Sequence, residues 1–333
     1  MKAIVLVSES GLPLARTLQR ELGEAGIYAK GIEAEGCTEI SSYSGFMREH
    51  FSEFESIVFI GAMGICVRSI AACLKNKYTD PAVVCIDSTG RFAIPVLSGH
   101  VGGANELARH IAAITGGQAA VTTQSDNTGL WALDILGKEN GWKTEATPAQ
   151  MNRCIGLFVN RKPTALLLNV KDKGTACLER TLPGHVKVFR HFEDIPQKEF
   201  ALILAVTPYI YIADVPMLCF RPAVLHLGVG CRKQCHPQGI AEQMEKTMQE
   251  AGLCPLSLAD VSTIELKKDE PLLEELQRRW PDTKRCIYSA EELKDIEVPN
   301  PSQKAFEVTG VYGVAEGAAL KSSNGGMLVL EKQ

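Results

Sequence analysis

The sequence predicts an α/β fold: an N-terminal Rossmann-like domain with a mixed or parallel sheet, a small middle module and a C-terminal three-layer α/β/α domain. Three observations support this prediction. Residues 1–140 repeat the order of β-rich run, small-residue loop and helix-periodic segment; residues 141–222 are β-rich with a weak helical pattern; and the strand–loop–helix order returns in residues 223–333. Strands that alternate with helices form a parallel-dominated sheet covered by helices on both faces.

The N-terminal domain is expected to contain three strand–loop–helix units and one hairpin. The strands are predicted at Ala3–Val7, Ser56–Ile60 and Phe92–Leu97, and the helices that follow them at Pro13–Leu22, Ile65–Leu74 and Ala104–Ile114. The run Ala82–Ile86 is joined to Phe92–Leu97 by Asp87-Ser88-Thr89-Gly90, which is typical of a hairpin turn. Because a hairpin reverses the chain, we expect a mixed sheet.

The two later parts differ from each other. In the middle module, β-rich runs lie at Ala165–Val170, Val186–Phe189 and Leu202–Val206, with one clear helical segment at Ala149–Leu157. The C-terminal domain is expected to contain a strand at Val224–Leu227, a helix at Pro237–Ala251, a strand–loop–helix unit at Val261–Trp280, a loop at Val298–Ser302 and a closing strand at Met327–Leu330. Proline at the first turn supports the predicted start of the helix at Pro237.

Composition excludes several classes of protein. The net charge of −4 over 333 residues argues against non-specific nucleic-acid binding. No run approaches the roughly 20 apolar residues of a membrane span, and Met1–Ser10 lacks the long apolar region of a signal peptide. The eleven cysteines are scattered through apolar runs, as in a reducing compartment, so we expect a cytoplasmic protein. Cys231, Cys235 and His236 could bind a metal, but a closed zinc site needs about four ligands, so no metal site is predicted.

The densest motif is Leu97–Ala108, LSGHVGGANELA. Its glycines allow a sharp turn close to a ligand, and the helix that follows presents free N–H groups suited to a carboxylate. The loop follows a strand, and ligands of open α/β sheets bind at the carboxyl ends of strands. His100 is therefore the best candidate for an acid–base group, and we expect the helix N-terminus to lower its pKa and favour neutral imidazole. The alternative is a structural histidine in a tight turn.

Three further loops are weaker candidates. Gly61-Ala62-Met63-Gly64 precedes a helix with Arg68, but its spacing matches neither a nucleotide-binding fingerprint nor a P-loop. Thr122, Thr123 and Asp126 follow a predicted strand, where hydroxyl groups contact ligands or cap a helix. The loop Gly228-Val229-Gly230-Cys231-Arg232-Lys233 combines glycine flexibility with two cations and so predicts an anion site. Lys267 lies in a charged run that a solvated face also explains.

Taken together, these motifs resemble the cobalt-precorrin-5A hydrolases of anaerobic cobalamin synthesis. The resemblance rests on two sets of residues: Gly61–Ile65, Arg68, Lys77–Val83, Asp87, Gly90, Leu97–Ala108 and Thr122-Thr123, then Leu227–Lys233, Lys267, Asp269-Glu270 and Val314–Leu320. Gln124-Ser125 and Gln234-Cys235-His236 depart from the family pattern, and the middle module resembles it least. The resemblance implies a tetrapyrrole substrate whose δ-lactone is opened, with release of acetaldehyde to give cobalt-precorrin-5B. It implies no cofactor of the protein itself, since cobalt arrives with the substrate.

The resemblance also implies site residues. The catalytic candidates are His100, Glu106 and Asp126, and His100 has a third conceivable role as an axial contact to the cobalt. The substrate-binding candidates are Gly61, Gly64, Arg68, Ser98, Gly99, Gly102, Gly103, Asn105, Thr122, Thr123, Gly228, Gly230, Cys231, Arg232, Lys233, Lys267 and Glu316. A homodimer or transient contacts with neighbouring pathway enzymes are the predicted protein partners. The alternatives are a non-catalytic corrinoid carrier and a nucleotide-dependent enzyme, and the missing GxGxxG motif after Val7 argues against the second.

Overall fold

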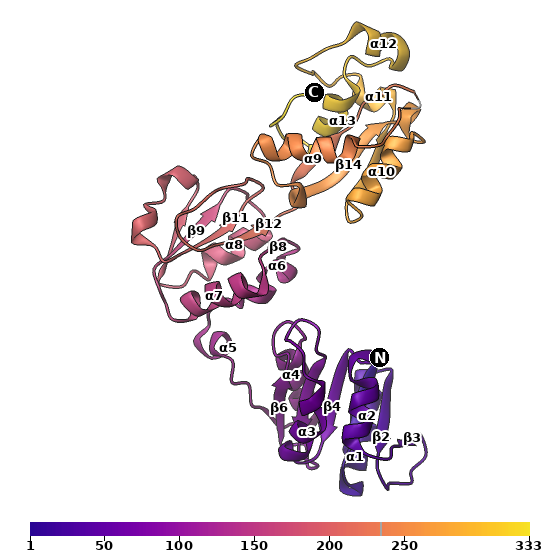
Figure 1. Cartoon of the computed structure of the whole chain (residues 1–333), viewed down its shortest axis with the longest axis vertical. Coiled ribbons are helices and arrows are strands. Elements are labelled where there is room, and N and C mark those ends of the chain that lie inside the picture. Colours follow the sequence, from indigo (N-terminus) through magenta and orange to yellow (C-terminus); the bar gives the residue numbers. More distant parts are fainter. Residues whose placement is uncertain (234) are drawn as a thin grey trace. The chain divides into compact units, whose positions relative to one another are not determined.

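The computed structural model describes residues 1–233 and 235–333, without the side chains of Ser125 and Asn127. Gln234, one of the departures from the family pattern, therefore lies outside the described residues. The chain forms two compact units, Met1–Ile135 and Leu136–Gln333 (Figure 1). Three β-sheets lie in the described chain, one in the first unit and two in the second. This architecture confirms the predicted α/β fold class.

The sheet of the first unit is mixed, as predicted. Its strands run in the order β3-β2-β1-β4-β5-β6-β7. They are β1 Lys2–Leu6, β2 Ala25–Ala29, β3 Cys37–Glu39, β4 Ser56–Ile60, β5 Ala82–Ile86, β6 Phe92–Leu97 and β7 Gln118–Ala119. Among the described residues of this sheet, β5 and β6 form the one antiparallel pair. Asp87 closes their turn by accepting hydrogen bonds from the backbone N–H groups of Thr89, Arg91 and Phe92.

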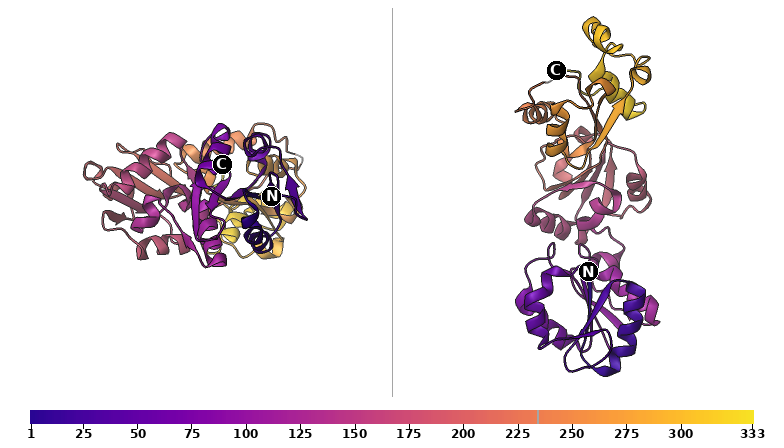
Figure 2. Two further views of the ribbon diagram at one scale, coloured as in Figure 1. Left: turned by 90° about the horizontal axis from the view of Figure 1, so that it is seen from below. Right: turned by 90° about the vertical axis from the view of Figure 1, so that its right-hand side faces the viewer.

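Helices cover both faces of this sheet, as the right-hand view of Figure 2 shows. On one face, α1 (Leu12–Leu22) and α4 (Ala104–Thr115) contribute Leu18 and Ile111 to a shared core with Ile4. On the other face, α2 (Tyr43–His50) and α3 (Met63–Ile70) pack Met47 and Ile70 against Val5. Alternate residues of β1 therefore belong to opposite cores, as strand geometry requires. Helix α5 (Gln124–Thr128) follows β7, and α6 (Leu133–Asn140) begins in this unit and ends in the next.

The second unit begins with another α/β module, because the middle region contains more helix than its sequence pattern predicted. Its sheet has the order β10-β9-β11-β12-β8, with β8 antiparallel to β12 and the other pairs parallel. The strands are β8 Lys143–Glu145, β9 Thr164–Leu168, β10 Val186–Phe189, β11 Leu202–Val206 and β12 Met217–Arg221, and the helices are α7 Pro148–Val159 and α8 Lys173–Arg180. Helix α8 escaped prediction because it is short and half of it is polar.

The C-terminal module has three layers. Its parallel sheet has the order β13-β14-β15, with β13 Leu225–Gly228, β14 Leu258–Ile264 and β15 Lys284–Tyr288. On one face, α9 (Ile240–Glu250) and α10 (Pro271–Arg279) pack Ala241 and Leu276 against Val261. On the other face, α11 (Ala290–Leu293) and α13 (Val314–Ser323) pack Leu293 and Ala318 against Ile264. Helix α12 spans Gln303–Thr309.

Two predictions for the C-terminal module are wrong. Residues Met327–Leu330 form no strand within the described chain: Met327 is 83% exposed, while Leu330 packs beside Leu225 and Leu227. The third strand is instead Lys284–Tyr288, whose charged first half hides its β character. The predicted helix at Pro237 begins at Ile240, after Gly239 in the left-handed conformation. No helix of the described residues is long and apolar enough to cross a membrane.

Candidate functional site

A cluster of ionisable side chains forms where β6 and β7 end. These two strands are parallel to each other, but β6 is antiparallel to β5, and Leu97 at the end of β6 pairs with Val83 at the start of β5. The loops after β6 and β7 therefore emerge together, beside the chain that enters β5. They carry His100 and Thr123, and α5 follows with Asp126. The hairpin thus brings residues from three separate loops to one edge of the sheet.

The glycine-rich loop folds back tightly on Ser98. Ser98 has a left-handed backbone with φ of 56°, is buried, and donates its hydroxyl to the carbonyl of Asp80, with 2.9 Å between Oγ and O. A Cβ on Gly102 would lie 2.4 Å from the Cβ of Ser98, and Gly103 begins α4 with a left-handed φ of 85°. Glycine at 102 and 103 is therefore required by the turn itself. His100 begins this turn, because its carbonyl accepts the N–H of Gly103 with 3.0 Å between N and O.

His100 lies between two carboxylates. Its Nε2 is 2.7 Å from Oδ2 of Asp126, and its Nδ1 is 3.4 Å from Oδ1 of Asp134, in the first turn of α6. The side chains are largely buried, with 16% of His100, 15% of Asp126 and 8% of Asp134 exposed. A carboxylate beside each ring nitrogen favours the doubly protonated, charged form of the imidazole.

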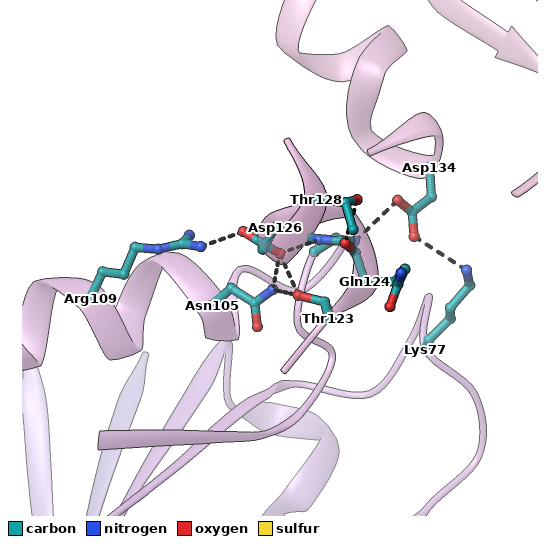
Figure 3. Close-up of polar contacts among 9 residues, drawn as sticks. Lys77, Asn105, Arg109, Thr123, Gln124, Asp126, Thr128 and Asp134 are labelled. Atoms are coloured by element: carbon teal, nitrogen blue, oxygen red, sulfur yellow. Dashed lines mark hydrogen bonds and ion pairs between the residues drawn. The ribbon is translucent and has the colours of Figure 1, made fainter. Parts of the chain in front are cut away.

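Both carboxylates have further partners (Figure 3). Asp126 accepts hydrogen bonds from Thr123, from Arg109 on α4, and from Asn105 at 2.9 Å between Nδ2 and Oδ2. Asp134 pairs with Lys77, with 3.2 Å between Nζ and Oδ2. Two carboxylates thus meet three cationic groups, so the cluster can keep its carboxylates ionised in a partly dry environment.

The cluster raises the pKa of His100. The hydrogen bond to Asp134 is the largest cause; burial opposes it, and the bond to Asp126 adds to it. The prediction that the helix N-terminus lowers this pKa is therefore wrong, because two adjacent carboxylates outweigh a helix dipole. Burial alone would raise the pKa of Asp126, but bonds from Thr123, Arg109 and His100 hold it below its usual value. Burial would also raise the pKa of Asp134, and His100 and Lys77 reverse that effect.

Three predicted residues of the first unit lie apart from this cluster. Gly61, Gly64 and Arg68 follow the carboxyl end of β4, where Gly61 donates to the carbonyl of Ile86 at the end of β5. That is the opposite edge of the sheet, because β6 runs against β4 and β5. Arg68 is exposed there. The expectation that the glycine loop sits at the carboxyl ends of the parallel strands holds for β6 and β7 only.

Two predicted site residues on the cluster's own edge face solvent. Glu106 on α4 and Thr122 before α5 are both exposed. Gly99 has a different part, because a Cβ there would lie 2.8 Å from Oδ1 of Asn105, which itself bonds Asp126. The catalytic role of Glu106 and the substrate-binding roles of Thr122 and Gly99 stay predictions.

The C-terminal candidates gather where β13 and β14 end. Lys267 pairs with Glu270 at 3.3 Å between Nζ and Oε1, and both side chains are nearly buried. Burial, together with the Glu270 carboxylate, raises the pKa of the Cys231 thiol, so that Cys231 stays neutral beside the pair. Arg232 and Lys233 are exposed on the adjacent loop and can reach an anion.

Two C-terminal candidates have structural contacts that explain them. A Cβ on Gly228 would lie 1.8 Å from the carbonyl oxygen of Ala315, so glycine here lets α13 pack on β13; Gly230 has more room, at 3.4 Å from the nitrogen of Ala315. Glu316 is buried and accepts hydrogen bonds from Asn300, at 2.8 Å between Nδ2 and Oε1, and from the backbone of Lys332. Glu316 thus holds two C-terminal segments against α13.

Sequence reasoning missed Lys77, Arg109 and Asp134 as members of the cluster. Lys77 did stand in a motif, Lys77–Val83, but nothing in the sequence showed that this loop precedes the strand paired with β6. Asp134 lies in the first turn of a short helix, where an acidic residue usually serves the helix dipole. Arg109 is four residues from Asn105 on one face of α4, a spacing that could have indicated it once Asn105 was singled out.

Comparison with known proteins gives a consistent result along the whole chain. Three family models match in order: Cobalamin synthesis G N-terminal over residues 45–126, Cobalamin biosynthesis central region over 131–222 and Cobalamin synthesis G C-terminus over 225–333. A cobalt-precorrin-5A hydrolase of Priestia megaterium is 33% identical over 349 residues, which cover 99% of this chain and 91% of that protein. A cobalt-precorrin-5A hydrolase of Salmonella typhimurium is 26% identical, with 98% and 93% covered.

A solved structure is also similar. The crystal structure of a cobalamin biosynthesis protein G homolog from Sulfolobus solfataricus covers 96% of this chain and 88% of its own, with 18% sequence identity and a TM-score of 0.40. At that TM-score the likeness adds nothing to the fold described above.

The charge cluster predicts how stability depends on pH. The raised pKa of His100 stabilises the fold fully below about pH 6.5, and this contribution is lost as pH rises through the folded-state pKa. The lowered pKa values of Asp126 and Asp134 stabilise the fold above about pH 3.9, and that contribution is lost as pH falls. We therefore expect the difference in melting temperature between the wild type and His100→Asn to be largest between about pH 3.9 and pH 6.5. A difference that grows from pH 7 to pH 9 would contradict the assignment.

Proposed function

The chain belongs to the cobalt-precorrin-5A hydrolase family, and we propose that His100, held between Asp126 and Asp134, carries the proton transfers of the lactone opening. The activity is hydrolysis of the lactone of cobalt-precorrin-5A, which gives cobalt-precorrin-5B and acetaldehyde. Near full-length identity of 33% to the Priestia megaterium hydrolase supports the activity. The paired carboxylates on the two nitrogens of one imidazole support the assignment to His100.

Lactone opening needs a proton donor and an acceptor at one place. Water adds its oxygen to the acyl carbon, the bond from that carbon to the ring oxygen breaks, and the departing oxygen takes a proton to become a hydroxyl. A protonated His100 can supply that proton, and the imidazole left behind can accept the proton lost by the water. Because Asp126 and Asp134 favour the charged form, they return His100 to its protonated state after each cycle.

Carbon–carbon cleavage follows from the product of the first step. Removal of the hydroxyl proton lets that oxygen form a carbonyl, the bond to the ring carbon breaks, and acetaldehyde leaves. The electron pair stays on the ring carbon, which is conjugated with the macrocycle and then takes a proton. We propose that no organic cofactor or added metal takes part, since cobalt belongs to the substrate and the two steps together need no external oxidant or reductant.

The substrate is polyanionic, and exposed cations in the second unit can bind its carboxylates. Arg232 and Lys233 follow a glycine loop, are exposed, and have no ion pair among the described residues. The nearby Lys267 is engaged with Glu270, so it is less available. We propose that the Arg232–Lys233 loop holds substrate carboxylates. A cytoplasmic location and a homodimer, or transient contacts with pathway enzymes, stay predictions.

The reaction assay tests the role of His100. We expect anaerobic incubation of the purified chain with cobalt-precorrin-5A, without nucleotide, flavin or metal, to release acetaldehyde. His100→Asn keeps a hydrogen-bonding group but carries no titratable proton, so it should fold, bind substrate and lose roughly 10²–10⁴ in turnover. His110→Gln, an exposed histidine on α4, is the matched control and should stay at the wild-type rate. Normal turnover by His100→Asn would remove His100 from the chemistry, and an altered spectrum of bound cobalt would then indicate axial contact.

Binding measurements test the carboxylate loop. Arg232→Ala removes a charged hydrogen-bond donor, so we expect it to weaken binding of cobalt-precorrin-5A by roughly 1.5–3 kcal/mol. The difference in affinity between this variant and the wild type should become smaller at high salt, because salt screens exposed charges. Lys246→Ala is the control, because Lys246 is exposed and pairs with Glu250 on α9. Equal affinity of both variants would show that substrate carboxylates bind elsewhere. Zinc present in stoichiometric amount and lost in Cys231→Ser would show that the loop is a metal site.

A further inference from the structure

A second histidine–aspartate pair lies in the C-terminal module, and neither of its residues was among the predicted site residues. His226 on β13 and Asp260 on β14 are neighbours across the two strands, and Nδ1 of His226 is 2.6 Å from Oδ2 of Asp260. Side chains two residues apart on a strand share a face, so His226 lies on the face where Gly228 meets Ala315 of α13. The hydroxyls of Tyr288 and Ser322, 2.9 Å apart, join β15 to α13 on the same side.

The pair has one unsatisfied atom and one available atom. Oδ1 of Asp260 is buried and has no hydrogen-bond partner among the described residues. His226 has 22% of its side chain exposed, and within the same part of the chain its Nε2 contacts no donor or acceptor. A sheet facing a helix is packed at least as well by apolar residues as by a buried ionic pair. A buried carboxylate oxygen without a partner is uncommon in folded proteins, and strain, a bound water or ion, or a chemical role accounts for such cases.

His226 differs from His100 in what its nitrogens meet. Both nitrogens of His100 face carboxylates, which favours the protonated imidazole and so suits a proton donor. Only Nδ1 of His226 does so, and Asp260 thereby fixes the ring with Nε2 as the open nitrogen. An imidazole oriented by a carboxylate through one nitrogen can accept a proton at the other, as in hydrolases that use a histidine–aspartate pair.

The two-step reaction needs a group of this kind. After lactone opening, the hydroxyl proton must be removed while the carbon–carbon bond breaks, and an imidazole nitrogen that faces no carboxylate, on a ring oriented by a carboxylate at the other nitrogen, suits that task. We propose that Nε2 of His226 accepts this hydroxyl proton, with Asp260 as its positioning residue; this inference rests on the proposed function. The oxygen's electron pair then forms the carbonyl of acetaldehyde, and the pair of the broken bond goes to the ring carbon, which is protonated.

Single-turnover kinetics separate the two steps. Cobalt-precorrin-5A is mixed anaerobically with excess full-length protein, the ring-opened hydroxy acid is followed by mass spectrometry, and acetaldehyde is followed through its enzymatic reduction. His226→Gln should open the lactone at the wild-type rate, accumulate the hydroxy acid and release acetaldehyde about 10²-fold more slowly. Asp260→Asn should show the same intermediate with a smaller loss and an altered pH dependence of release. His191→Gln, an exposed histidine of the same unit, should match the wild type.

Several results would overturn the inference. Acetaldehyde release at the wild-type rate by His226→Gln would do so, as would equal slowing of both steps together with a lower melting temperature, which indicates a purely structural pair. If the glutamine variant fails to fold, His226→Ala with added imidazole replaces it: restored release supports the inference, and a folded variant that imidazole leaves slow contradicts it. A wild-type protein that opens no lactone would overturn the proposed function and this inference together.

Discussion

The antiparallel pairing of β5 with β6 is the constraint on which the candidate site depends. In a fully parallel sheet, the loop after β6 would emerge beside Gly61 and Gly64, at the carboxyl ends of β4 and β5. The hairpin at Asp87 reverses β6, and β7 follows the reversed direction. The glycine-rich loop is thereby carried to the opposite edge, where the segments before β5 and after β7 also lie. Lys77, His100 and Asp126 can meet only because of this reversal.

The charges in this cluster then determine the protonation of His100. A lone histidine at a helix N-terminus would lose its proton readily, but Asp126 and Asp134 each hold one nitrogen of His100. Hydrogen bonds from Arg109, Asn105 and Thr123 stabilise the ionised form of Asp126, and the ion pair with Lys77 stabilises that of Asp134. Neither carboxylate therefore has to take the imidazole proton of His100. His100 is thereby held in place in a form that favours protonation and that can regain its proton after each cycle. In the second pair, by contrast, Asp260 contacts only Nδ1 of His226.

The sequence predicted the local elements well and the long-range contacts poorly. The strands at Ser56–Ile60, Ala82–Ile86 and Phe92–Leu97 were predicted to the residue, because each is a short apolar run bounded by turn residues. The hairpin was also predicted, but its consequence for the position of His100 was not. A sequence motif indicates the strand that precedes it, but it does not show whether the neighbouring strands run parallel or antiparallel to that strand. Lys77 and Asp134 are 57 residues apart and join only through tertiary structure. Gly228 looked like a ligand loop, and its contact with Ala315 shows a packing reason that no local pattern contains.

Titration of His100 by nuclear magnetic resonance tests the central claim most directly. Spectra of histidine-labelled full-length protein, with the His100 signal identified by its loss in His100→Asn, give its pKa in the wild type and in Asp134→Asn. The account predicts a wild-type value above the ordinary value of about 6.5 and a clear fall in Asp134→Asn, because the largest cause of the shift is removed. Asp282→Asn, which alters an exposed pair with Lys143, should leave the titration unchanged. A wild-type value below the ordinary one, or one that Asp134→Asn does not lower, would contradict the account.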